Sequence, residues 1–285
     1  MRVKELFAFI RERYAIYVRR FEEGLPKPWT SDPILQRYRF CNVYRELDAV
    51  TVWIRKNWRS PYHKHPDLWF AMVVARLLNL PASLEALDVE RHVLNWDPKS
   101  FKKILRVRKE AGERVFNGAY MIHADAKEGW LKTDYLAERV LIPMWKDRET
   151  VRPRKGDRLE QFYNRLRNYR DMGPFMIGQV IADTKYVAPL LQASDWWTWA
   201  APGPGSQRGL NRVTGRAPGE PWKDGQVNHW LPTLQKLQTK IDPLLREAGM
   251  PRMCAQDLQN CLCEFDKYER VRLGEGRPKQ LYPGV

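Results

Sequence analysis

The chain has 285 residues, of which 44% are hydrophobic and 29% charged, and it carries 12 tryptophans. This length suits one large domain or two moderate ones, and the composition excludes a largely disordered protein. Lys and Arg outnumber Asp and Glu by 49 to 34, which gives a formal net charge of +15. Such a charge favours polyanionic partners, nucleic acid first, although ribosome-associated proteins, membrane-surface binders and ordinary basic enzymes share it.

The sequence predicts a cytoplasmic protein with no membrane span. Its longest apolar stretch, residues 68–80, is interrupted by Arg76 and Asn79 and is shorter than the roughly 20 residues that a bilayer requires. The N-terminus is charged within five residues and lacks the pattern of a secretory signal. Four cysteines are too few for a disulfide framework in a chain of this length, so we expect reduced thiols.

The first part of the chain alternates helical patterns with a proline-rich connection. Apolar residues recur at spacings of four and three from Val3 to Phe21, which predicts an amphipathic helix that ends at Gly24. Residues 25–33 contain three prolines and predict an extended connection, with Asp32 as the cap of the next helix. We expect that second helix over residues 34–55.

Helical periodicity continues along the chain, and strand patterns are nearly absent. The predicted fold class is therefore all-α, with a helix-hairpin-helix DNA glycosylase-like arrangement. The domain prediction is one helical unit over residues 1–285, or two helical lobes over 1–150 and 151–285. Further helices are expected at residues 67–78, 83–95, 98–111, 134–145, 174–191, 227–248 and 254–270.

The densest basic segment, residues 152–170, leads into a tight turn at Gly173 and a helix that opens with Pro174. In a helix-hairpin-helix, such a turn points backbone N–H groups at a DNA phosphate. The predicted DNA-binding residues are Gly173, Arg165, Arg167 and Arg170. A solvated helical face and an ordinary turn are the alternatives, because Asp171 and Met176 stand where the motif usually has a glycine and a small residue.

Asp195 follows Gly173 by 22 positions (195 minus 173), which resembles the spacing of the catalytic aspartate in helix-hairpin-helix glycosylases. Its structural alternative is a cap for the aromatic turn at residues 196–199. Residues 200–210 contain too much glycine and proline for regular structure and predict an anion-binding loop, with Arg208 as a bidentate donor. This loop lacks the Gly-Lys-Ser or Gly-Lys-Thr ending of a P-loop, and a merely structural loop is the alternative.

The predicted helix 34–55 places an amide, a guanidinium and a carboxylate on one face through Asn42, Arg45 and Glu46. A solvent-exposed Arg–Glu pair is the alternative. Two pairs of candidate metal ligands, His63 with His65 and His123 with Asp125, lack a second pair at zinc spacing. The sequence therefore predicts neither a metal site nor a cofactor.

Several short blocks carry a family resemblance. Residues 38–48 (YRFCNVYRELD) resemble the N-terminal signature of the alpha-glutamyl/putrescinyl thymine pyrophosphorylase family. Residues 116–120 (FNGAY), the Gly-Pro-Gly segment with residues 208–210, and residues 257–268, which include LCEFDKY, look like the later blocks of that family. The similarity spans roughly residues 30–270.

This resemblance implies an amino-acid:DNA transferase of phage DNA modification, working in the host cytoplasm. An amine would displace pyrophosphate from 5-pyrophosphoryloxymethyl-uracil in DNA and leave a hypermodified thymine. The implied partners are DNA bearing activated 5-hydroxymethyluracil and a free amino acid or polyamine. Related helical domains accompany 5-hydroxymethyluracil DNA kinases, but the absence of a phosphate-donor loop from the sequence favours transfer over phosphorylation.

The transfer reaction requires an exposed base, a stabilised leaving group and a deprotonated amine. Addition of the Cys41 thiol to the ring is a further option. The alternatives are a helix-hairpin-helix base glycosylase that uses Asp195, and a noncatalytic basic DNA-binding protein. The predicted catalytic residues are Asn42, Arg45, Glu46 and Asp195. The predicted substrate and pyrophosphate residues are Trp196, Gly203, Gly205, Ser206, Arg208, Asp257 and Lys267.

Overall fold

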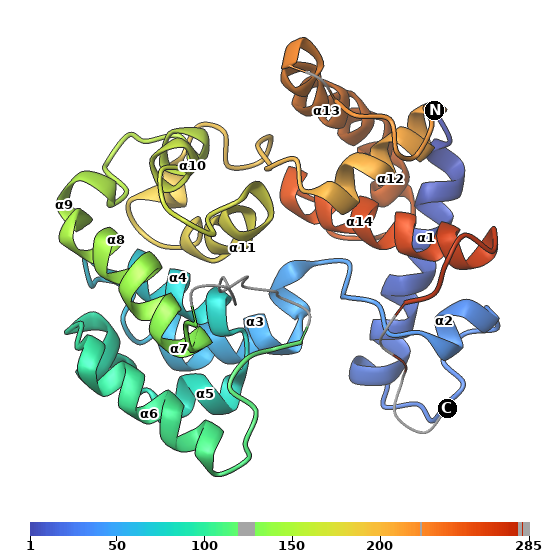
Figure 1. Ribbon diagram of the computed structural model, residues 1–285. Helices are drawn as coiled ribbons and strands as arrows, with labels where there is room; N and C mark the ends of the chain where they lie inside the picture. The colour runs from blue at the N-terminus through green and yellow to red at the C-terminus, as the bar shows by residue number, and fades with distance from the viewer. Residues whose placement is uncertain (119–128, 223, 279–280, 282–285) are drawn as a thin grey trace. The chain divides into compact units, whose positions relative to one another are not determined.

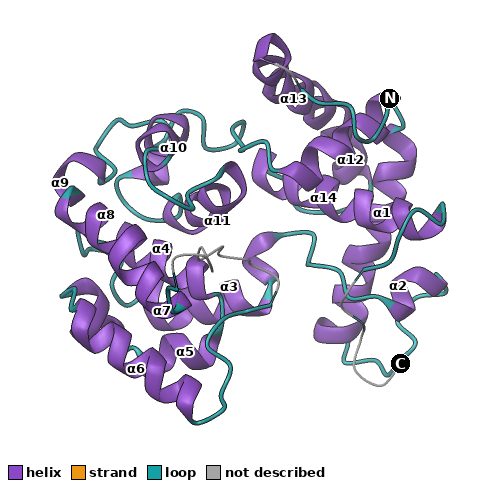
Figure 2. Cartoon of the chain, in the orientation of Figure 1, coloured by secondary structure: helices purple, strands orange, loops and turns teal. Residues whose placement is uncertain are grey.

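Helices joined by loops make up the computed structural model, which describes residues 1–118, 129–222, 224–278 and 281 (Figures 1 and 2). In these residues there is no β-strand, and the one extended pairing is an isolated antiparallel bridge between Tyr38 and Leu281. The predicted all-α class is confirmed. No helix in the described ranges is long and apolar enough to cross a membrane.

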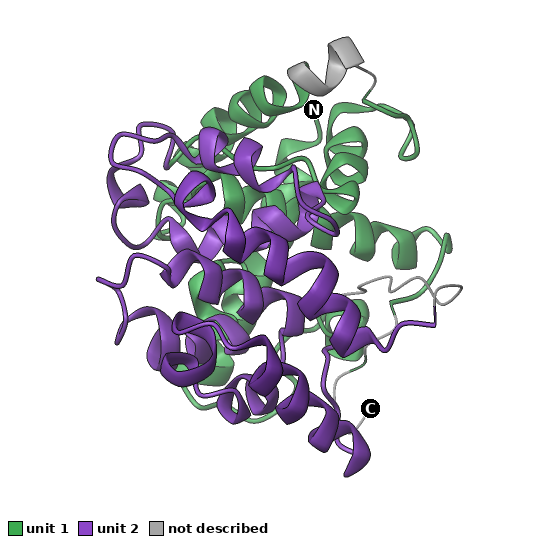
Figure 3. Ribbon diagram, turned by 60° about the vertical axis from the view of Figure 1, so that its left-hand side comes forward, with its two compact units in different colours: residues 1–48, 197–285 green, residues 49–196 purple. Residues whose placement is uncertain are grey.

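The contacts between residues divide the chain into two compact units (Figure 3). Unit 1 combines residues 1–48 with residues 197–285, and unit 2 consists of residues 49–196. The two predicted lobes, 1–150 and 151–285, share a single boundary, whereas the two units have boundaries after residue 48 and after residue 196.

Unit 1 is built around one amphipathic helix, α14 (Ala255–Arg272), which packs against its neighbours α1, α12 and α13. From α1, Phe9 reaches the rings of Phe265 and Tyr268 at centroid distances of 5.5 and 5.0 Å. Aromatic contacts of this kind bury large apolar areas and fix the approach of the two helices. The other elements of unit 1 are α1 (Val3–Tyr17), η1 (Val18–Glu22), α2 (Pro33–Arg37), η2 (Arg45–Leu47), α12 (Pro204–Thr214) and α13 (Asp224–Glu247).

Helices α12 and α14 lie side by side with two glycines at their contact (Figure 1). A Cβ at Gly209 would stand 2.0 Å from the carbonyl oxygen of Leu262, and one at Gly205 would stand 2.4 Å from the Cys263 sulfur. Glycines four residues apart share one helix face and let two backbones approach closely. The predicted loop over residues 200–210 was wrong from residue 204 onward, because Pro204 starts a helix in which these glycines pack.

Unit 2 surrounds the fully buried helix α4 (Leu68–Leu78), which pairs with α11 (Pro174–Thr184). A helix that is buried on every face is a core helix, and Arg76 is the one charged residue of α4. The remaining elements of unit 2 are α3 (Ala49–Ile54), η3 (Arg55–Arg59), α5 (Pro81–Ala86), η4 (Val89–Leu94), α6 (Pro98–Glu110), α7 (Lys132–Tyr135), η6 (Leu136–Leu141), α8 (Ile142–Lys146), α9 (Arg148–Val151), α10 (Leu159–Leu166) and η7 (Leu190–Gln192).

A buried ion pair links α4 to α11 inside unit 2. Arg76 donates to both carboxylate oxygens of Asp183, at 2.6 and 2.8 Å, and also to the Thr51 hydroxyl at 2.8 Å. Arg59 lies 3.8 Å from the same carboxylate. A buried charge is tolerated only when it is paired and hydrogen-bonded, so this bidentate contact fixes the two helices in one register.

The expected helix over residues 34–55 is broken into three short pieces. Helix α2 ends at Arg37, residues 38–44 run in extended or bent conformation, and the 3₁₀ turn η2 precedes α3. The Asp32 cap is confirmed, since its carboxylate accepts the N–H groups of Ile34 and Leu35 at 2.8 and 3.0 Å. The helical periodicity of residues 38–48 was misleading, because their apolar side chains are buried although the backbone is extended.

Candidate nucleic-acid interface

The extended segment 39–45 is fastened to α14 by hydrogen bonds from side chain to backbone. The Asn260 amide donates to the carbonyl of Asn42 at 3.1 Å, and the Asp257 carboxylate accepts the N–H of Arg45 at 3.0 Å. A backbone without a ladder of its own needs such partners when it is buried. Two of the blocks that carry the family resemblance therefore fold against each other.

Two charged side chains of α14 complete this attachment. The Glu264 carboxylate accepts the N–H of Cys41 at 3.0 Å, and the Lys267 ammonium donates to the carbonyl of Arg39 at 3.0 Å. Lys267 also lies 2.6 Å from Glu264 and 4.4 Å from the ring centroid of Phe40. In the structure, the predicted substrate residues Asp257 and Lys267 hold a chain segment in place.

The predicted catalytic face of Asn42, Arg45 and Glu46 does not form, because the helix that would present it is absent. Arg45 is buried, and the Asn42 side chain accepts the N–H of the next residue, Val43. The nearby Glu264 carboxylate raises the pKa of the Cys41 thiol above its ordinary value. A protonated thiol is a poor nucleophile, so this environment opposes covalent addition by Cys41.

Asp195 caps a helix. Its two carboxylate oxygens accept the backbone N–H groups of Leu159 and Glu160 at 2.7 and 3.1 Å, at the start of α10. The sequence predicted a catalytic aspartate, with a cap for the turn at residues 196–199 as the alternative, whereas the helix that Asp195 caps begins 36 residues before it (195 minus 159). Trp196 is similarly engaged, since its indole N–H donates to the Lys185 carbonyl at 2.8 Å and its ring lies 3.7 Å from the Lys185 ammonium.

The residues of the predicted anion-binding loop make contacts within α12 and with α14. Gly203 caps α12, and the Ser206 hydroxyl is buried and donates to the Gly203 carbonyl at 2.8 Å. Arg208 donates from Nε to the Asp266 carboxylate at 3.0 Å, although its side chain remains 40% exposed. Gly205 faces α14, so its missing Cβ serves the packing of two helices.

The predicted DNA-binding segment joins α10 to α11 in unit 2. Gly173 caps α11 with an extended backbone, and Asp171 takes a left-handed φ of 56° within the turn. Arg165 is partly buried and bonds to the Asp157 carboxylate and the Val151 carbonyl. Arg167 and Arg170 are exposed, and the Arg167 guanidinium lies 5.7 Å from the ring centroid of Tyr163.

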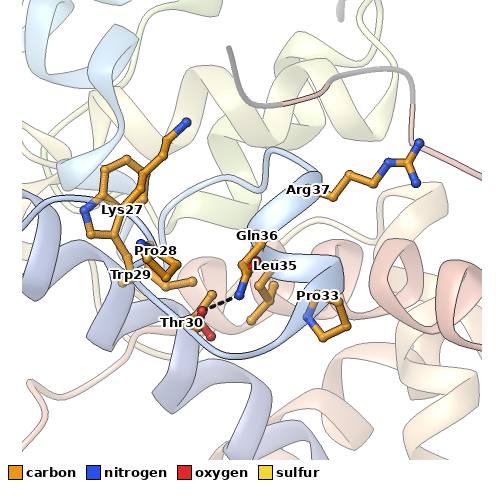
Figure 4. Close-up of a pocket in the computed structure, with 9 residues that line it drawn as sticks. Lys27, Pro28, Trp29, Thr30, Pro33, Leu35, Gln36 and Arg37 are labelled. Carbon is orange, nitrogen blue, oxygen red and sulfur yellow. Dashed lines mark hydrogen bonds between the residues drawn. The ribbon is translucent and has the colours of Figure 1, made fainter. Parts of the chain in front are cut away.

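Unit 1 contains a pocket of about 440 Å³ that the sequence analysis did not predict (Figure 4). Lys27 and Arg37 lie at opposite ends of its labelled residues (Figure 4). The Gln36 amide donates to the Thr30 carbonyl at 2.7 Å across it. The pocket is lined by Ile16, Lys27, Pro28, Trp29, Thr30, Pro33, Leu35, Gln36 and Arg37.

The sequence contained a signal for this pocket. Residues 19–29 contain three cations and two aromatic residues together with Glu22 and Glu23. Cations close to aromatic residues are typical of surfaces that stack bases and bind phosphates. The sequence analysis interpreted residues up to Gly24 as the end of the first helix and residues 25–33 as a proline-rich connection. In the structure, residues 25–32 contain no regular element.

Candidate metal ligands give no cluster among the described residues, where no three His, Cys, Asp or Glu side chains are grouped suitably. His63 and His65 are described, and their ring nitrogens contact the Ser60 carbonyl and the Asp67 N–H. His123 and Asp125 lie outside the described residues. Of the block 116–120, Asn117 is described and bonds to the carbonyls of Leu78 and Asn79 at 2.9 and 3.1 Å.

Comparison with known proteins corrects the predicted reaction. The family model "5-hmdU DNA kinase, helical domain" matches residues 1–277. A 5-hmdU DNA kinase of Bacillus phage SP10 is 35% identical over 122 residues, which cover 41% of this chain and 19% of that protein. The chain thus spans about one fifth of the length of this relative. No solved structure matches the chain.

These matches overturn the amino-acid:DNA transferase and its glycosylase alternative, because the proteins that match are named for phosphorylation of 5-hmdU. Of what the resemblance to the pyrophosphorylase family implied, the matches support phage DNA modification that involves 5-hydroxymethyluracil. The error came from the absence of a phosphate-donor loop. This absence excludes a P-loop within this sequence, but it does not exclude a kinase of which this sequence is one part. The chain belongs to the family of 5-hmdU DNA kinase helical domains.

Proposed function

We propose that this chain is the DNA-recognition part of a system that phosphorylates the 5-hydroxymethyl group of 5-hmdU in DNA. The match of residues 1–277 to the kinase helical domain carries the proposal. The net charge of +15 supports it, because Lys and Arg side chains that neutralise phosphates supply most of the affinity for a DNA backbone.

The reaction assigns separate tasks to separate parts. The hydroxymethyl oxygen attacks the terminal phosphorus of a nucleoside triphosphate, its proton passes to a base, and the bond to the leaving diphosphate breaks. The sequence contains no Gly-Lys-Ser or Gly-Lys-Thr loop. We therefore assign the nucleotide to another domain or protein, and to this chain the binding of DNA and the exposure of the modified base.

Exposure of the base is required because a base inside a duplex is shielded by its neighbours. Enzymes that modify bases act on single strands or turn the base out of the stack. A helical domain that grips the backbone and holds one base outside the helix would deliver the hydroxymethyl group to the phosphate donor.

The test is a comparison of DNA that differs only in the modified base. We expect the chain to bind duplexes and single strands containing 5-hmdU, with about 2- to 10-fold preference over thymine, because one additional hydroxyl contributes roughly one hydrogen bond. Fluorescence anisotropy with matched oligonucleotides measures both affinities. Lack of DNA binding at low salt, or equal affinity for the two bases, contradicts the proposal.

A further inference from the structure

We propose that Arg208 and Arg270 bind one phosphate group between them on the surface of unit 1, and that a DNA backbone supplies this phosphate. We call this pair the arginine clamp. The inference rests on the proposed function for its DNA source, and it names a place where unit 1 holds the strand. Both arginines and the carboxylate that positions them, Asp266, lie within residues 197–285 of unit 1.

The contact between α12 and α14 brings these three side chains together. Gly209 lets the backbone of α12 approach Leu262 of α14, and the two helices lie side by side (Figure 1). Asp266 follows Leu262 by about one helical turn, so it shares the face of α14 that meets α12. Arg208 donates from Nε to Oδ2 of Asp266 at 3.0 Å. One turn further along α14, Nε of Arg270 lies 3.3 Å from the same oxygen.

The cations around Asp266 outnumber the acids that neutralise them. The Asp266 side chain is 3% exposed, and a third arginine, Arg212, donates to its other oxygen, Oδ1, at 2.7 Å. Both terminal nitrogens of Arg212 bond the Glu275 carboxylate. Three guanidinium groups in this network therefore share two carboxylates, and one positive charge is in excess. The excess falls on Arg208 and Arg270, which both contact a single oxygen of Asp266.

Asp266 holds the clamp by the inner nitrogen of each guanidinium, Nε. The terminal nitrogens, Nη1 and Nη2, carry the other N–H donors of the group. In the described ranges, these terminal nitrogens of Arg208 and Arg270 make no hydrogen bond. The two side chains are 40% and 36% exposed, whereas that of Arg212 is 3% exposed. The buried carboxylate thus fixes two arginines whose remaining donors are accessible from solvent.

A phosphate group suits both the geometry and the charge of the clamp. Guanidinium groups bind phosphate oxygens through parallel N–H donors, and such charge-assisted bonds are stronger than neutral ones. Two groups that contact the same carboxylate oxygen are close enough for one phosphate to reach both. Each phosphodiester of DNA carries a single negative charge, which equals the excess charge of the network. This match favours a DNA backbone over the more highly charged phosphates of a free nucleotide.

The first experiment removes the clamp. Arg208→Gln with Arg270→Gln should weaken binding of duplex DNA at low salt by about 10- to 100-fold, as expected for lost charge-assisted hydrogen bonds. The slope of log affinity against log salt should fall by about 0.9, the value for one phosphate contact. The matched control, Arg11→Gln with Arg246→Gln, removes two exposed arginines of α1 and α13 and should change both quantities little. Equal effects of the two double variants would overturn the assignment.

The second experiment separates the planar fork from its charge. Arg208→Lys with Arg270→Lys keeps both charges, but an ammonium cannot hold Asp266 with one nitrogen and a phosphate with two others. The lysine variant should therefore recover only part of the lost DNA affinity, and full recovery would overturn the clamp. Asp266 keeps its bond from Arg212 in both double variants, so thermal melting should show folded proteins.

Protection from an arginine reagent tests the clamp in the unchanged protein. Phenylglyoxal should modify Arg208 and Arg270, and a bound phosphate should protect both, as measured by mass spectrometry of peptides. Protection by a DNA duplex, and not by millimolar ATP, supports the proposal. Protection by ATP and not by the duplex overturns the DNA source and assigns the phosphate to a free nucleotide.

The same experiment distinguishes failure of the clamp from failure of the proposed function. If the duplex binds and neither arginine is protected, the clamp is overturned and the proposed function stands. If the duplex does not bind at low salt, the proposed function and the DNA source are both contradicted, and the ATP measurement still decides whether the clamp binds phosphate.

Discussion

Gly209 and Leu262 bring two helix backbones into direct contact, since a Cβ at residue 209 would lie 2.0 Å from the Leu262 carbonyl oxygen. A Cβ at Gly205, one turn earlier, would instead approach a side chain, with the Cys263 sulfur at 2.4 Å. A backbone carbonyl in a helix cannot move aside as a side chain can. The two glycines therefore differ in what a methyl group would cost.

We predict that Gly209→Ala lowers the free energy of unfolding by about 3 kcal/mol, because an overpacked contact forces α12 away from α14. Gly205→Ala should cost less, since the Cys263 sulfur can change rotamer. Gly219→Ala, with nothing within 4 Å of the added Cβ, is the control and should change stability little. Urea denaturation of the three variants measures the order, and a fully stable Gly209→Ala protein would contradict the contact.

Asp195 should affect stability and not DNA binding. Asp195→Ala removes the cap of α10 and should lower the free energy of unfolding by about 0.5–2 kcal/mol, whereas Asp195→Asn retains a capping oxygen and should cost less. Ser194→Ala, at an exposed neighbouring residue, is the control. Unchanged stability in Asp195→Ala together with lost DNA affinity would show that the side chain acts on DNA.

The exposed cations between α10 and α11 should contribute to DNA affinity without affecting the fold. Arg167→Gln with Arg170→Gln should reduce the salt slope for duplex DNA by about 1.8, which corresponds to two phosphate contacts. Arg165→Gln should instead destabilise unit 2, because that guanidinium is bonded to Asp157 and Val151. Anisotropy titrations at several salt concentrations, with thermal melting of each variant, separate the two effects.

Acid should weaken unit 1 through Glu269. Burial alone raises the pKa of this carboxyl, but hydrogen bonds from Arg272 and Arg2 outweigh burial and lower it below the ordinary 4.5. A carboxylate with a lowered folded-state pKa stabilises the protein above the unfolded pKa, and this stability is lost as pH falls through the folded value. The contribution should therefore be complete at neutral pH and decline below about pH 4.5.

We predict that Glu269→Gln lowers the free energy of unfolding at pH 7 by about 2 kcal/mol, since hydrogen bonds to charged groups are worth about 1.5–3 kcal/mol. The difference from the unchanged protein should shrink as the pH is lowered from 4.5. Glu5→Gln affects a carboxylate that is 56% exposed and should cost less than about 1 kcal/mol. A difference that stays constant down to pH 3 would exclude the pKa shift as its source.

Sequence periodicity predicted those helices that bury one face, or every face, in the protein core. The expected helices 67–78 and 98–111 correspond to α4 (Leu68–Leu78) and α6 (Pro98–Glu110). Periodicity failed at residues 38–48, where the partners of the backbone are side chains of α14, more than 200 residues away. The loop predicted from composition was wrong at residues 204–210, because the glycine content of a segment does not indicate that a second helix packs against Gly209.

The candidate site was predicted less well than the helices. Residues 38–48 and 257–268 were singled out by the resemblance. In the structure, side chains of the second block bond to the backbone of the first, and the reaction assigned to them was wrong. The pocket beside Trp29 depends on segments that the sequence analysis described as a connection and as the start of a helix over residues 34–55. Its cavity arises from their packing on Ile16 of α1, which no local pattern contains.

Unit 1 is assembled from two stretches of chain that are separated by the whole of unit 2. On the ribosome, residues 1–48 emerge first but cannot acquire their core until α12 and α14 have been synthesised. At about 5–20 residues per second, translation of the 224 residues from the end of this stretch to the end of α14 (272 minus 48) leaves α1 without its partners for roughly 11–45 seconds. The apolar stripe of α1 is thus a ready target for chaperones, whereas unit 2, continuous in sequence, can fold as soon as it leaves the exit tunnel.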